Sequence, residues 1–220
     1  QPWSAEQFLA VARSRGLLFE PGTGWSYSNL GYLALKLLLE QSLGQPLQAI
    51  LAELFFAPLG LAQTGVVTSL AEVADLTPGY SQALGDEDFV DMSQRYHPGW
   101  VSHGVVVSTV AELAALIDAL MTGQLLDPAL VEQMAEPVHS LGPHPPLHQV
   151  GCGLGLFSDT ASPYGRVAGH NGGGPGYSTA AFHFSTLAGR PTTIAAATNQ
   201  EGDNVGVDVV YAVARVLAAA

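Results

Sequence analysis

Apolar residues recur at helical spacing through the first quarter of the chain. Ser4 and Gln7 have the spacing of a capping box, and the apolar run that follows them stops at Gly16. Within residues 30–41 the apolar positions fall on one side, which predicts a mostly buried second helix. We expect helices between Ser4 and Gly16, between Ser28 and Gly44, and from Pro46 to about Phe56.

The helical periodicity disappears over residues 62–100 and returns after them. We expect this stretch to contain short strands and to shape a cleft, because so long a structureless loop is unusual inside a compact domain. Its acidic cluster, residues 86–88, is typical of a solvated loop, with a metal site as the alternative. Two more helices are predicted, from the capping box of Thr109 and Glu112 to Gly123, and from Asp127 to about Met134.

The last third of the chain changes to strand patterns. Residues 151–157 form an apolar strand candidate, and another candidate runs through residues 165–170. A Gly-rich turn over residues 172–176 joins it to the next strand, residues 177–184. A further strand is predicted over residues 190–198, and the short connections favour antiparallel pairing.

The order of these elements predicts the fold class. Helices come first, then strands in succession, then a final helix capped by Asp203 or Asn204. This order is typical of an α+β fold and differs from the alternation of a parallel α/β sheet. We expect one domain over residues 1–220, with a mainly helical part at 1–140 and antiparallel strands plus a helix at 150–220.

Charge and composition exclude several classes of protein. The net charge is −12 and the only lysine is Lys36, so the chain lacks a basic surface for nucleic acid or an anionic membrane. No apolar run reaches the roughly 18 residues of a membrane-spanning helix.

The single cysteine, Cys152, excludes an internal disulfide and is interpreted as a packing residue. His139, His144 and His148 are placed in a Pro-rich loop, with zinc binding as the alternative; we predict no metal and no cofactor.

Four polar groups are candidates for acyl-transfer chemistry, which needs a nucleophile, a proton acceptor and donors for an oxyanion. Tyr27 and Asn29 stand at a predicted helix head, where a phenol can shuttle a proton and an amide can both donate and accept. His170 can supply a third polar group and Gly173 a backbone N–H. The residue pattern alone also fits a helix cap, a core-edge tyrosine and an ordinary hairpin over residues 169–184.

Four short motifs follow one another between residues 20 and 184. They are Glu20-Pro21-Gly22-Thr23-x-Trp25-x-Tyr27-Ser28-Asn29-x-Gly31-Tyr32, Pro58-Leu59-Gly60-Leu61-x-x-Thr64, Val107-Ser108-Thr109-x-x-Glu112-Leu113 and Gly169-His170-Asn171-Gly172-Gly173. In this order they resemble motifs of the class C β-lactamase-like serine hydrolases, which include β-lactamases, D-alanyl-D-alanine carboxypeptidases, D-aminopeptidases and esterases. The last motif resembles Lys-Thr-Gly of β-lactamases, which is often His-x-Gly in the esterase and peptidase branches.

This resemblance implies a fold and a set of roles. The fold would be β-lactamase/transpeptidase-like, with an antiparallel sheet backed by terminal helices, an all-helical region beside it, and the site between them. Tyr27 would be the proton shuttle and Asn29 would bind a substrate amide. The third motif would supply His170 as an electrostatic partner, the N–H of Gly173 as an oxyanion donor, and Asn171 and Gly172 as further substrate-binding residues.

The family's first motif, Ser-x-x-Lys, is absent from the sequence, because Leu33 stands three residues before the only lysine, Lys36. In the family this motif lies upstream of the Tyr-x-Asn motif. We therefore expect an N-terminally incomplete chain, poorly soluble or oligomeric through an exposed sheet edge. Ser28 and Ser178 are the alternative nucleophiles; the side chain of Ser28 should point away from its neighbours, and Ser178 has no obvious base.

The leading functional hypothesis is a serine hydrolase that forms an acyl-enzyme with an ester, a β-lactam or a D-amino-acid peptide. Histidine at position 170 favours an esterase or peptidase over a β-lactamase. The alternatives are a catalytically inactive ligand-binding module of the same fold, and a structural domain whose motifs coincide by chance. Expected partners are a small-molecule or peptide substrate and either the missing N-terminal segment or another copy of the chain. The resemblance favours an extracytoplasmic location.

Overall fold

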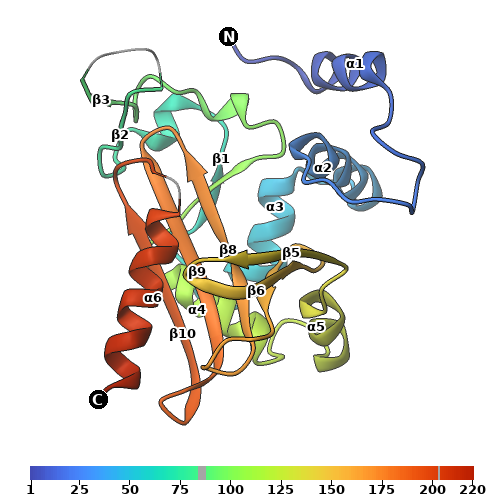
Figure 1. Cartoon of the computed structure of the whole chain (residues 1–220). Helices are drawn as coiled ribbons and strands as arrows, with labels where there is room; N and C mark the ends of the chain where they lie inside the picture. Colours follow the sequence, from blue (N-terminus) through green and yellow to red (C-terminus); the bar gives the residue numbers. More distant parts are fainter. Residues whose placement is uncertain (84–87, 203) are drawn as a thin grey trace. The chain divides into compact units, whose positions relative to one another are not determined.

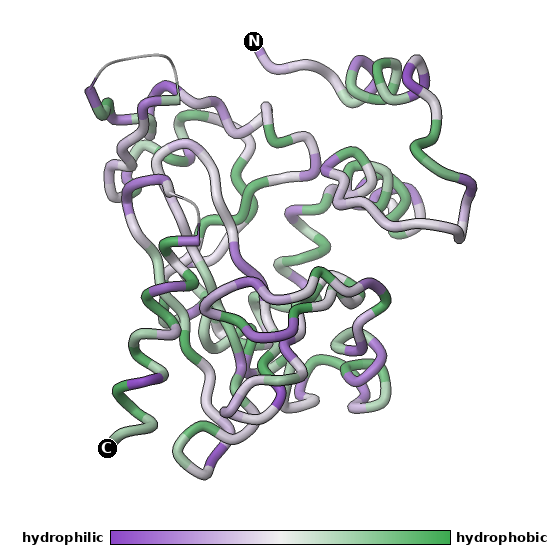
Figure 2. Tube along the Cα trace, in the orientation of Figure 1, coloured by the Kyte–Doolittle hydropathy of each residue, from purple (hydrophilic) through white to green (hydrophobic). Residues whose placement is uncertain are grey.

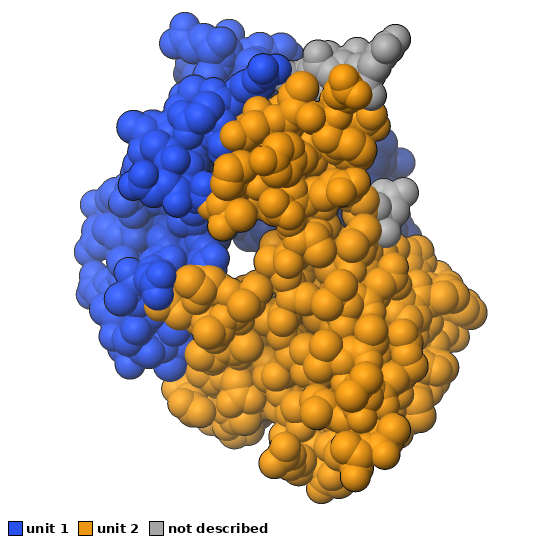
Figure 3. All heavy atoms as spheres, turned by 90° about the vertical axis from the view of Figure 1, so that its left-hand side faces the viewer, with its two compact units in different colours: residues 1–76, 93–108 blue, residues 77–92, 109–220 orange. Residues whose placement is uncertain are grey.

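The computed structural model describes residues 1–83, 88–202 and 204–220 (Figure 1). The chain divides into two compact units, coloured separately in Figure 3. Unit 1 comprises residues 1–76 and 93–108, and unit 2 comprises residues 77–92 and 109–220. The single domain expected from the sequence over residues 1–220 stays a prediction.

Consecutive helical segments make up most of unit 1. The predicted capping box forms, since the Ser4 hydroxyl accepts from the Gln7 N–H and the Gln7 side chain accepts from the Ser4 N–H. The Ser28 hydroxyl accepts from the Gly31 N–H at 3.0 Å and begins the second helix. The segments are α1 (Ala5–Arg15), α2 (Asn29–Leu43), which ends at the left-handed Gly44, α3 (Leu47–Leu51) and the π-helical η1 (Ala52–Phe56).

The predicted burial of α2 is wrong for this chain. Leu33 is the one buried residue of the helix, whereas Leu35 is 54% exposed and Leu38 is 59% exposed. Hydropathy along the helix is nevertheless high (Figure 2). Leucines also lie outside the apolar side on which the prediction was based, and a helix with this many apolar residues is normally covered by its surroundings. Within unit 1, α2 contacts α1 and α3, which leaves much of its surface open.

Short strands occur within residues 62–100, as predicted. In unit 1, β1 (Gly65–Val67) pairs antiparallel with β4 (Val105–Val107), and in unit 2, β2 (Tyr80–Ser81) pairs with β3 (Val90–Asp91). The 3-10 turns η2 (Leu70–Val73) and η3 (Pro98–Trp100) complete the stretch. Asp86 and Glu87 of the acidic cluster lie outside the described residues.

Unit 2 is organised around a six-stranded antiparallel sheet with the strand order β10-β9-β8-β7-β6-β5. The antiparallel pairing and the α+β class are as predicted from the sequence. The strands are β5 (His139–His144), β6 (Leu147–Cys152), β7 (Phe157–Asp159), β8 (Val167–Gly174), β9 (Tyr177–Leu187) and β10 (Arg190–Thr198), and the helices are α4 (Val110–Met121), α5 (Pro128–Ala135) and α6 (Val205–Ala218).

Three strand boundaries differ from the predictions. The candidate at residues 151–157 is the end of β6, a turn and the start of β7, because Gly153–Gly155 break the extended run. The predicted Gly-rich turn at 172–176 is shorter, because β8 continues to Gly174 by pairing with β9. The Pro-rich loop predicted to contain His139, His144 and His148 is the β5–β6 hairpin. Pairing between the two strands keeps these residues extended, although their sequence has no strand-like alternation of apolar and polar residues.

β9 is covered on both faces. Its Phe182 and Phe184 pack with Val210 and Tyr211 of α6 in the main core. On the alternate positions, His183 reaches Thr193 of β10, whose hydroxyl donates to a carboxylate oxygen of α4. Alternate residues of a strand point to opposite faces, so α6 and α4 cover opposite sides of the sheet. Figure 1 shows both helices beside β9 and β10.

The start of α6 is fixed by residues of β9. The Ser178 hydroxyl accepts from the Gly206 N–H at 3.1 Å, which satisfies a helix-start donor that has no partner inside the helix. A side chain at Gly206 would place its Cβ 2.7 Å from the Thr179 carbonyl carbon, so only glycine allows this approach. Asn204 is the N-cap residue, with φ 62°; the alternative cap, Asp203, lies outside the described residues.

A buried carboxylate ties β7 to β6. Asp159 has no exposed surface and accepts backbone hydrogen bonds from His148 at 2.8 Å and from Gln149 at 2.9 Å. The Ala161 N–H is a third donor, at 3.1 Å. Burial alone would raise the pKa of Asp159, but these hydrogen bonds outweigh it and lower the pKa below its ordinary value.

Replacing Asp159 with Asn is expected to lower the free energy of unfolding at pH 7 by about 1–3 kcal/mol, because an amide N–H then faces backbone donors. The lowered pKa means that the carboxylate stabilises the fold above about pH 4 and loses this effect as the pH falls through the folded-state pKa. Urea unfolding at pH 7 and pH 3 measures both effects.

Asp208→Asn, at an exposed position of α6, is the matched control, and its free energy of unfolding is expected to lie within about 0.5 kcal/mol of the parent value. Equal stability of the two variants at pH 7 would contradict this account.

Candidate active site

Tyr27 and Asn29 flank the residue that caps α2. Tyr27 is 53% exposed, and Asn29 is the exposed first residue of the helix. The hydroxyl of Ser28 between them accepts the Gly31 N–H, so this alternative nucleophile is engaged as the helix cap. The two flanking side chains start at a fixed helix end and are accessible to solvent.

Tyr27 stands at the end of a row of three rings within unit 1. The rings of Tyr27 and Tyr32 are tilted with centroids 5.9 Å apart, and the His103 ring lies 6.0 Å from Tyr32. Burial, followed by the nearby charge of Lys36, lowers the pKa of His103. His103 was not predicted, because it lies more than 70 positions from Tyr32 in sequence and only the fold brings the two rings together.

His170 lies in the middle of β8, where two neighbours fix its ring. Phe157 of β7 stacks on it with ring centroids 4.7 Å apart and an angle of 25° between the planes. Its Nδ1 makes a short hydrogen bond with the backbone oxygen of Asn171. Burial lowers the pKa of His170, and the hydrogen bond to Asn171 opposes the shift only in part. Phe157 was not predicted, since the β7–β8 register alone brings it to His170.

The second half of β8 has one edge without a strand partner in the described residues. Pairing between β7 and β8 ends at Phe157 opposite Gly169. From His170 to Gly174, β8 continues to pair with β9 alone. Backbone N–H and C=O groups on an unpaired edge can bind an extended ligand in the way that another strand would. The predicted third motif therefore lies along a strand edge that can receive a peptide-like group.

The glycines of this motif have different surroundings. A Cβ at Gly172 would lie 2.7 Å from the Thr179 hydroxyl, whereas a Cβ at Gly173 would meet no atom within 4 Å. The space beside Gly173 is open, so a ligand can approach its backbone closely. The side-chain amide of Asn171 donates to the Asn204 side chain at 3.5 Å, near the start of α6.

The second alternative nucleophile, Ser178, is buried and hydrogen-bonded. Its hydroxyl accepts the Gly206 N–H at the start of α6. The six predicted site residues thus form two groups, Tyr27 with Asn29 in unit 1 and the four consecutive residues 170–173 in unit 2. Each group is held by its own local structure.

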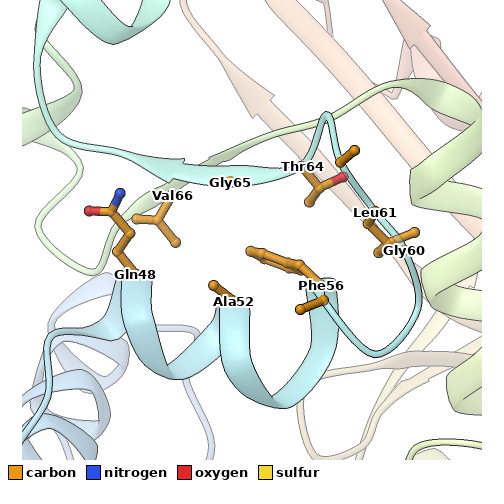
Figure 4. Close-up of a pocket in the computed structure, with 10 residues that line it drawn as sticks. Gln48, Ala52, Phe56, Gly60, Leu61, Thr64, Gly65 and Val66 are labelled. Carbon is orange, nitrogen blue, oxygen red and sulfur yellow. The ribbon is translucent and has the colours of Figure 1, made fainter.

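Unit 1 also contains an apolar hollow with a volume of about 440 Å³. Figure 4 shows the ring of Phe56 and the side chain of Val66 in the space between the helical segment α3–η1 and strand β1. The lining includes Thr64 and Gln48 as polar residues and none of the six predicted site residues. The hollow therefore offers apolar surface and few groups for chemistry.

The described residues contain no cluster of three or more His, Cys, Asp or Glu side chains that could hold a metal ion. His139 and His144 lie at opposite ends of β5, while His148 on β6 has its Nδ1 3.3 Å from the Asp159 carboxylate. Among the helices described, none has both the length and the apolar character needed to cross a membrane.

Comparison with known proteins finds similar proteins that are longer than this chain. Penicillin-binding protein 4* of Bacillus subtilis (strain 168) is 27% identical over 171 residues, which cover 73% of this chain and 37% of that protein. The D-stereospecific amidohydrolase from Streptomyces sp. superposes with a TM-score of 0.79 at 29% identity, covering 94% of this chain and 60% of that one. The D-amino acid amidase from Ochrobactrum anthropi SV3, complexed with L-phenylalanine amide, gives a TM-score of 0.73 at 24% identity and covers 99% and 63%.

The chain therefore spans less than two thirds of the length of these relatives. Its fold is β-lactamase/transpeptidase-like, with helices and antiparallel sheets. The sequence matches the Beta-lactamase family over residues 1–219, nearly its whole length. The chain belongs to this family of β-lactamase-like serine hydrolases.

Proposed function

We propose that this chain forms the substrate-binding part of a serine hydrolase that cleaves amide bonds next to D-amino acids, with its nucleophile on a polypeptide outside these 220 residues. The observation that carries the proposal is the β8 edge from His170 to Gly174, which is unpaired toward β7 and bears the third motif. The likeness to a D-stereospecific amidohydrolase supports an amide substrate. Esters, β-lactams and D-amino-acid peptides belong to the same chemical class, because all react by acyl transfer.

The proposed reaction is acyl transfer in two steps. A serine oxygen attacks the substrate carbonyl carbon, and the Gly173 N–H stabilises the negative oxygen that forms. Tyr27 takes the serine proton and delivers it to the leaving amine as the carbon–nitrogen bond breaks, while Asn29 holds the substrate amide. Water then hydrolyses the acyl-enzyme and restores the serine. Asn171 and Gly172 line the bound substrate.

The serine is proposed to come from outside the chain for a chemical reason. Lys36 is the only lysine, and Leu33 occupies the position that a Ser-x-x-Lys motif would require. The two alternative nucleophiles, the hydroxyls of Ser28 and Ser178, accept backbone N–H groups at helix starts. The chain alone is therefore proposed to be inactive.

An apolar face of unit 1 is the proposed contact for that missing polypeptide. Exposed leucines lie along α2, and the apolar hollow lies between η1 and β1. In unit 2, β10 lies at one edge of the described sheet, opposite the edge formed by β5, and its pairing with β9 is regular from Thr192 to Thr198. Apolar helix surface and a regular strand edge are features that a further part of a protein covers.

The absence of Ser-x-x-Lys also favours a second function, a ligand-binding module without turnover. This module would bind the same amides along β8 and would not react with a serine-directed phosphonate in any longer form of the protein. Stoichiometric labelling by such a phosphonate would exclude it.

Hydrolysis of D-phenylalanine amide is expected only when the chain is combined with a polypeptide that carries Ser-x-x-Lys. In that active form, Tyr27→Phe is expected to lower kcat by about 10²- to 10⁴-fold, because the proton shuttle is lost. Tyr80→Phe, at an exposed tyrosine of unit 2, is the matched control and should leave kcat unchanged. Release of ammonia measures the rate. Turnover by the chain alone, or full activity of Tyr27→Phe, would refute the proposal.

The chain alone is expected to self-associate through the apolar face of α2. Replacing Leu35 and Leu39 with Gln should shift it toward monomer, because it reduces the exposed apolar area. Light scattering after gel filtration measures the mass over a range of concentrations. Leu130→Gln with Leu154→Gln, at exposed leucines of unit 2, is the matched control. A monomeric parent chain at high concentration would count against an uncovered face.

A further inference from the structure

The β8–β9 hairpin ends in a tip made largely of glycine. Among the described residues, β8 pairs with β9 alone from His170 onward, and the pairing ends at Gly174 opposite Tyr177. The three successive residues Gly172–Gly174 have more backbone freedom than any other residue type would have there. Paired strands open most easily at such an end. Contacts outside this pairing therefore decide how firmly the backbone of Gly173 is held.

A short segment of unit 2, residues 77–82, contacts this tip, and we call it the strap. Four successive backbone carbonyls of the strap each accept a hydrogen bond. Their donors, in order from Thr77 to Tyr80, are the Tyr177 hydroxyl at 2.7 Å, the Asn199 side-chain amide at 3.0 Å, the Met92 N–H at 2.7 Å and the Glu201 N–H at 3.4 Å. Tyr80, in β2, also forms a parallel bridge with Gln200 just after β10 (Figure 1). The strap is thus fixed to the start of β9 and to the residues that follow β10.

Two glycines let the strap approach the hairpin tip closely. A Cβ at Gly79 would collide with the ring of Tyr177 and would lie 2.7 Å from the Gly176 carbonyl oxygen. A Cβ at Gly176, which has φ 90°, would lie 2.7 Å from the Gly79 carbonyl carbon. The two backbones are therefore in direct contact, and a side chain at either position would push them apart.

Tyr177 joins the strap to the last residue pair of β8. Its backbone pairs with Gly174, and its hydroxyl donates to the Thr77 carbonyl. Burial, followed by the nearby charge of Asp91, raises the pKa of this phenol, so the donor keeps its proton well above neutral pH. Removing the hydroxyl alone would leave the ring in place and the Thr77 carbonyl without its donor.

We propose that the strap braces the tip of the β8–β9 hairpin and that Tyr177 is a positioning residue, which keeps the Gly173 N–H in the orientation that acyl transfer requires. Tyr177 acts through the neighbouring pairs, Gly174 with Tyr177 and Gly173 with Ser178. The inference rests on the proposed function, in which the Gly173 N–H is the oxyanion donor. Such a donor acts chiefly in the transition state, so loosening it lowers kcat more than it weakens substrate binding.

The brace is tested on the 220-residue chain by amide hydrogen exchange, measured by NMR at pH 7. Tyr177→Phe is expected to speed exchange of the protected amides within residues 172–178 by about threefold to tenfold, because a hydrogen bond that closes the tip is lost. Asn199→Ala, which removes the donor to Pro78 and leaves Tyr177 intact, should act in the same direction.

Tyr164→Phe is the matched control, at a half-buried tyrosine that packs on Phe184 of the core. This variant should leave exchange at the tip unchanged. In all three variants, exchange at Phe182 in the middle of β9 should stay within about twofold of the parent rate. Unchanged exchange at the tip in Tyr177→Phe or in Asn199→Ala, or equal acceleration throughout β9, overturns the brace.

The positioning role is tested in the active form, in which the chain is combined with a polypeptide that carries Ser-x-x-Lys. Tyr177→Phe is expected to lower kcat for D-phenylalanine amide by about threefold to thirtyfold, less than the outright loss of an oxyanion donor, and to leave KM within about twofold. Tyr164→Phe should change neither constant. An unchanged kcat, or a raised KM without a fall in kcat, overturns the positioning role. If exchange responds as expected but the combined polypeptides hydrolyse no amide, the proposed function and the positioning role fail and the brace stands.

Discussion

The pairing of β8 with β9 is the constraint on which the rest of unit 2 depends. β9 is its most buried strand, because Phe182 and Phe184 face α6 and the alternate residues face the side covered by α4. A strand covered on both faces has its register fixed, since a slip by one residue would exchange its two faces. Through that register β9 positions every residue of β8 from Val167 to Gly174. The backbone of the third motif is therefore positioned by the core strand beside it.

The same pairing holds the glycines of the third motif in an extended conformation. Gly172 and Gly173 carry no side chain that packs, yet they lie in extended backbone opposite Thr179 and Ser178. The Ser178 hydroxyl also accepts the Gly206 N–H at the start of α6, so one residue of β9 contacts both this helix and the strand that carries the open edge. An edge preorganised in this way loses little conformational freedom when a ligand binds.

Unit 1 has a different balance of forces. The helices have well-formed ends, with caps at Ser4 and Ser28, but α2 buries only Leu33. Capping hydrogen bonds each contribute about 1 kcal/mol, whereas burial of a leucine contributes roughly 1.5–3 kcal/mol. The exposed leucines of α2 therefore contribute little of the burial free energy that they could provide if they were covered.

The sequence by itself determined the local features. Helix starts and stops follow from side chains within four residues of each end, as at Ser4 and Gly44, and the four motifs identified the family because each is contiguous. Tertiary structure decided what depends on distant partners. Gly172–Gly174 form a strand because β9 lies beside them, the His139–His148 stretch is a hairpin because its two halves pair, and Phe157 meets His170 through register alone. The exposure of α2 could not be predicted from the sequence either. An apolar pattern shows which surface of a helix is suited to burial, but it does not show whether another element packs against that surface.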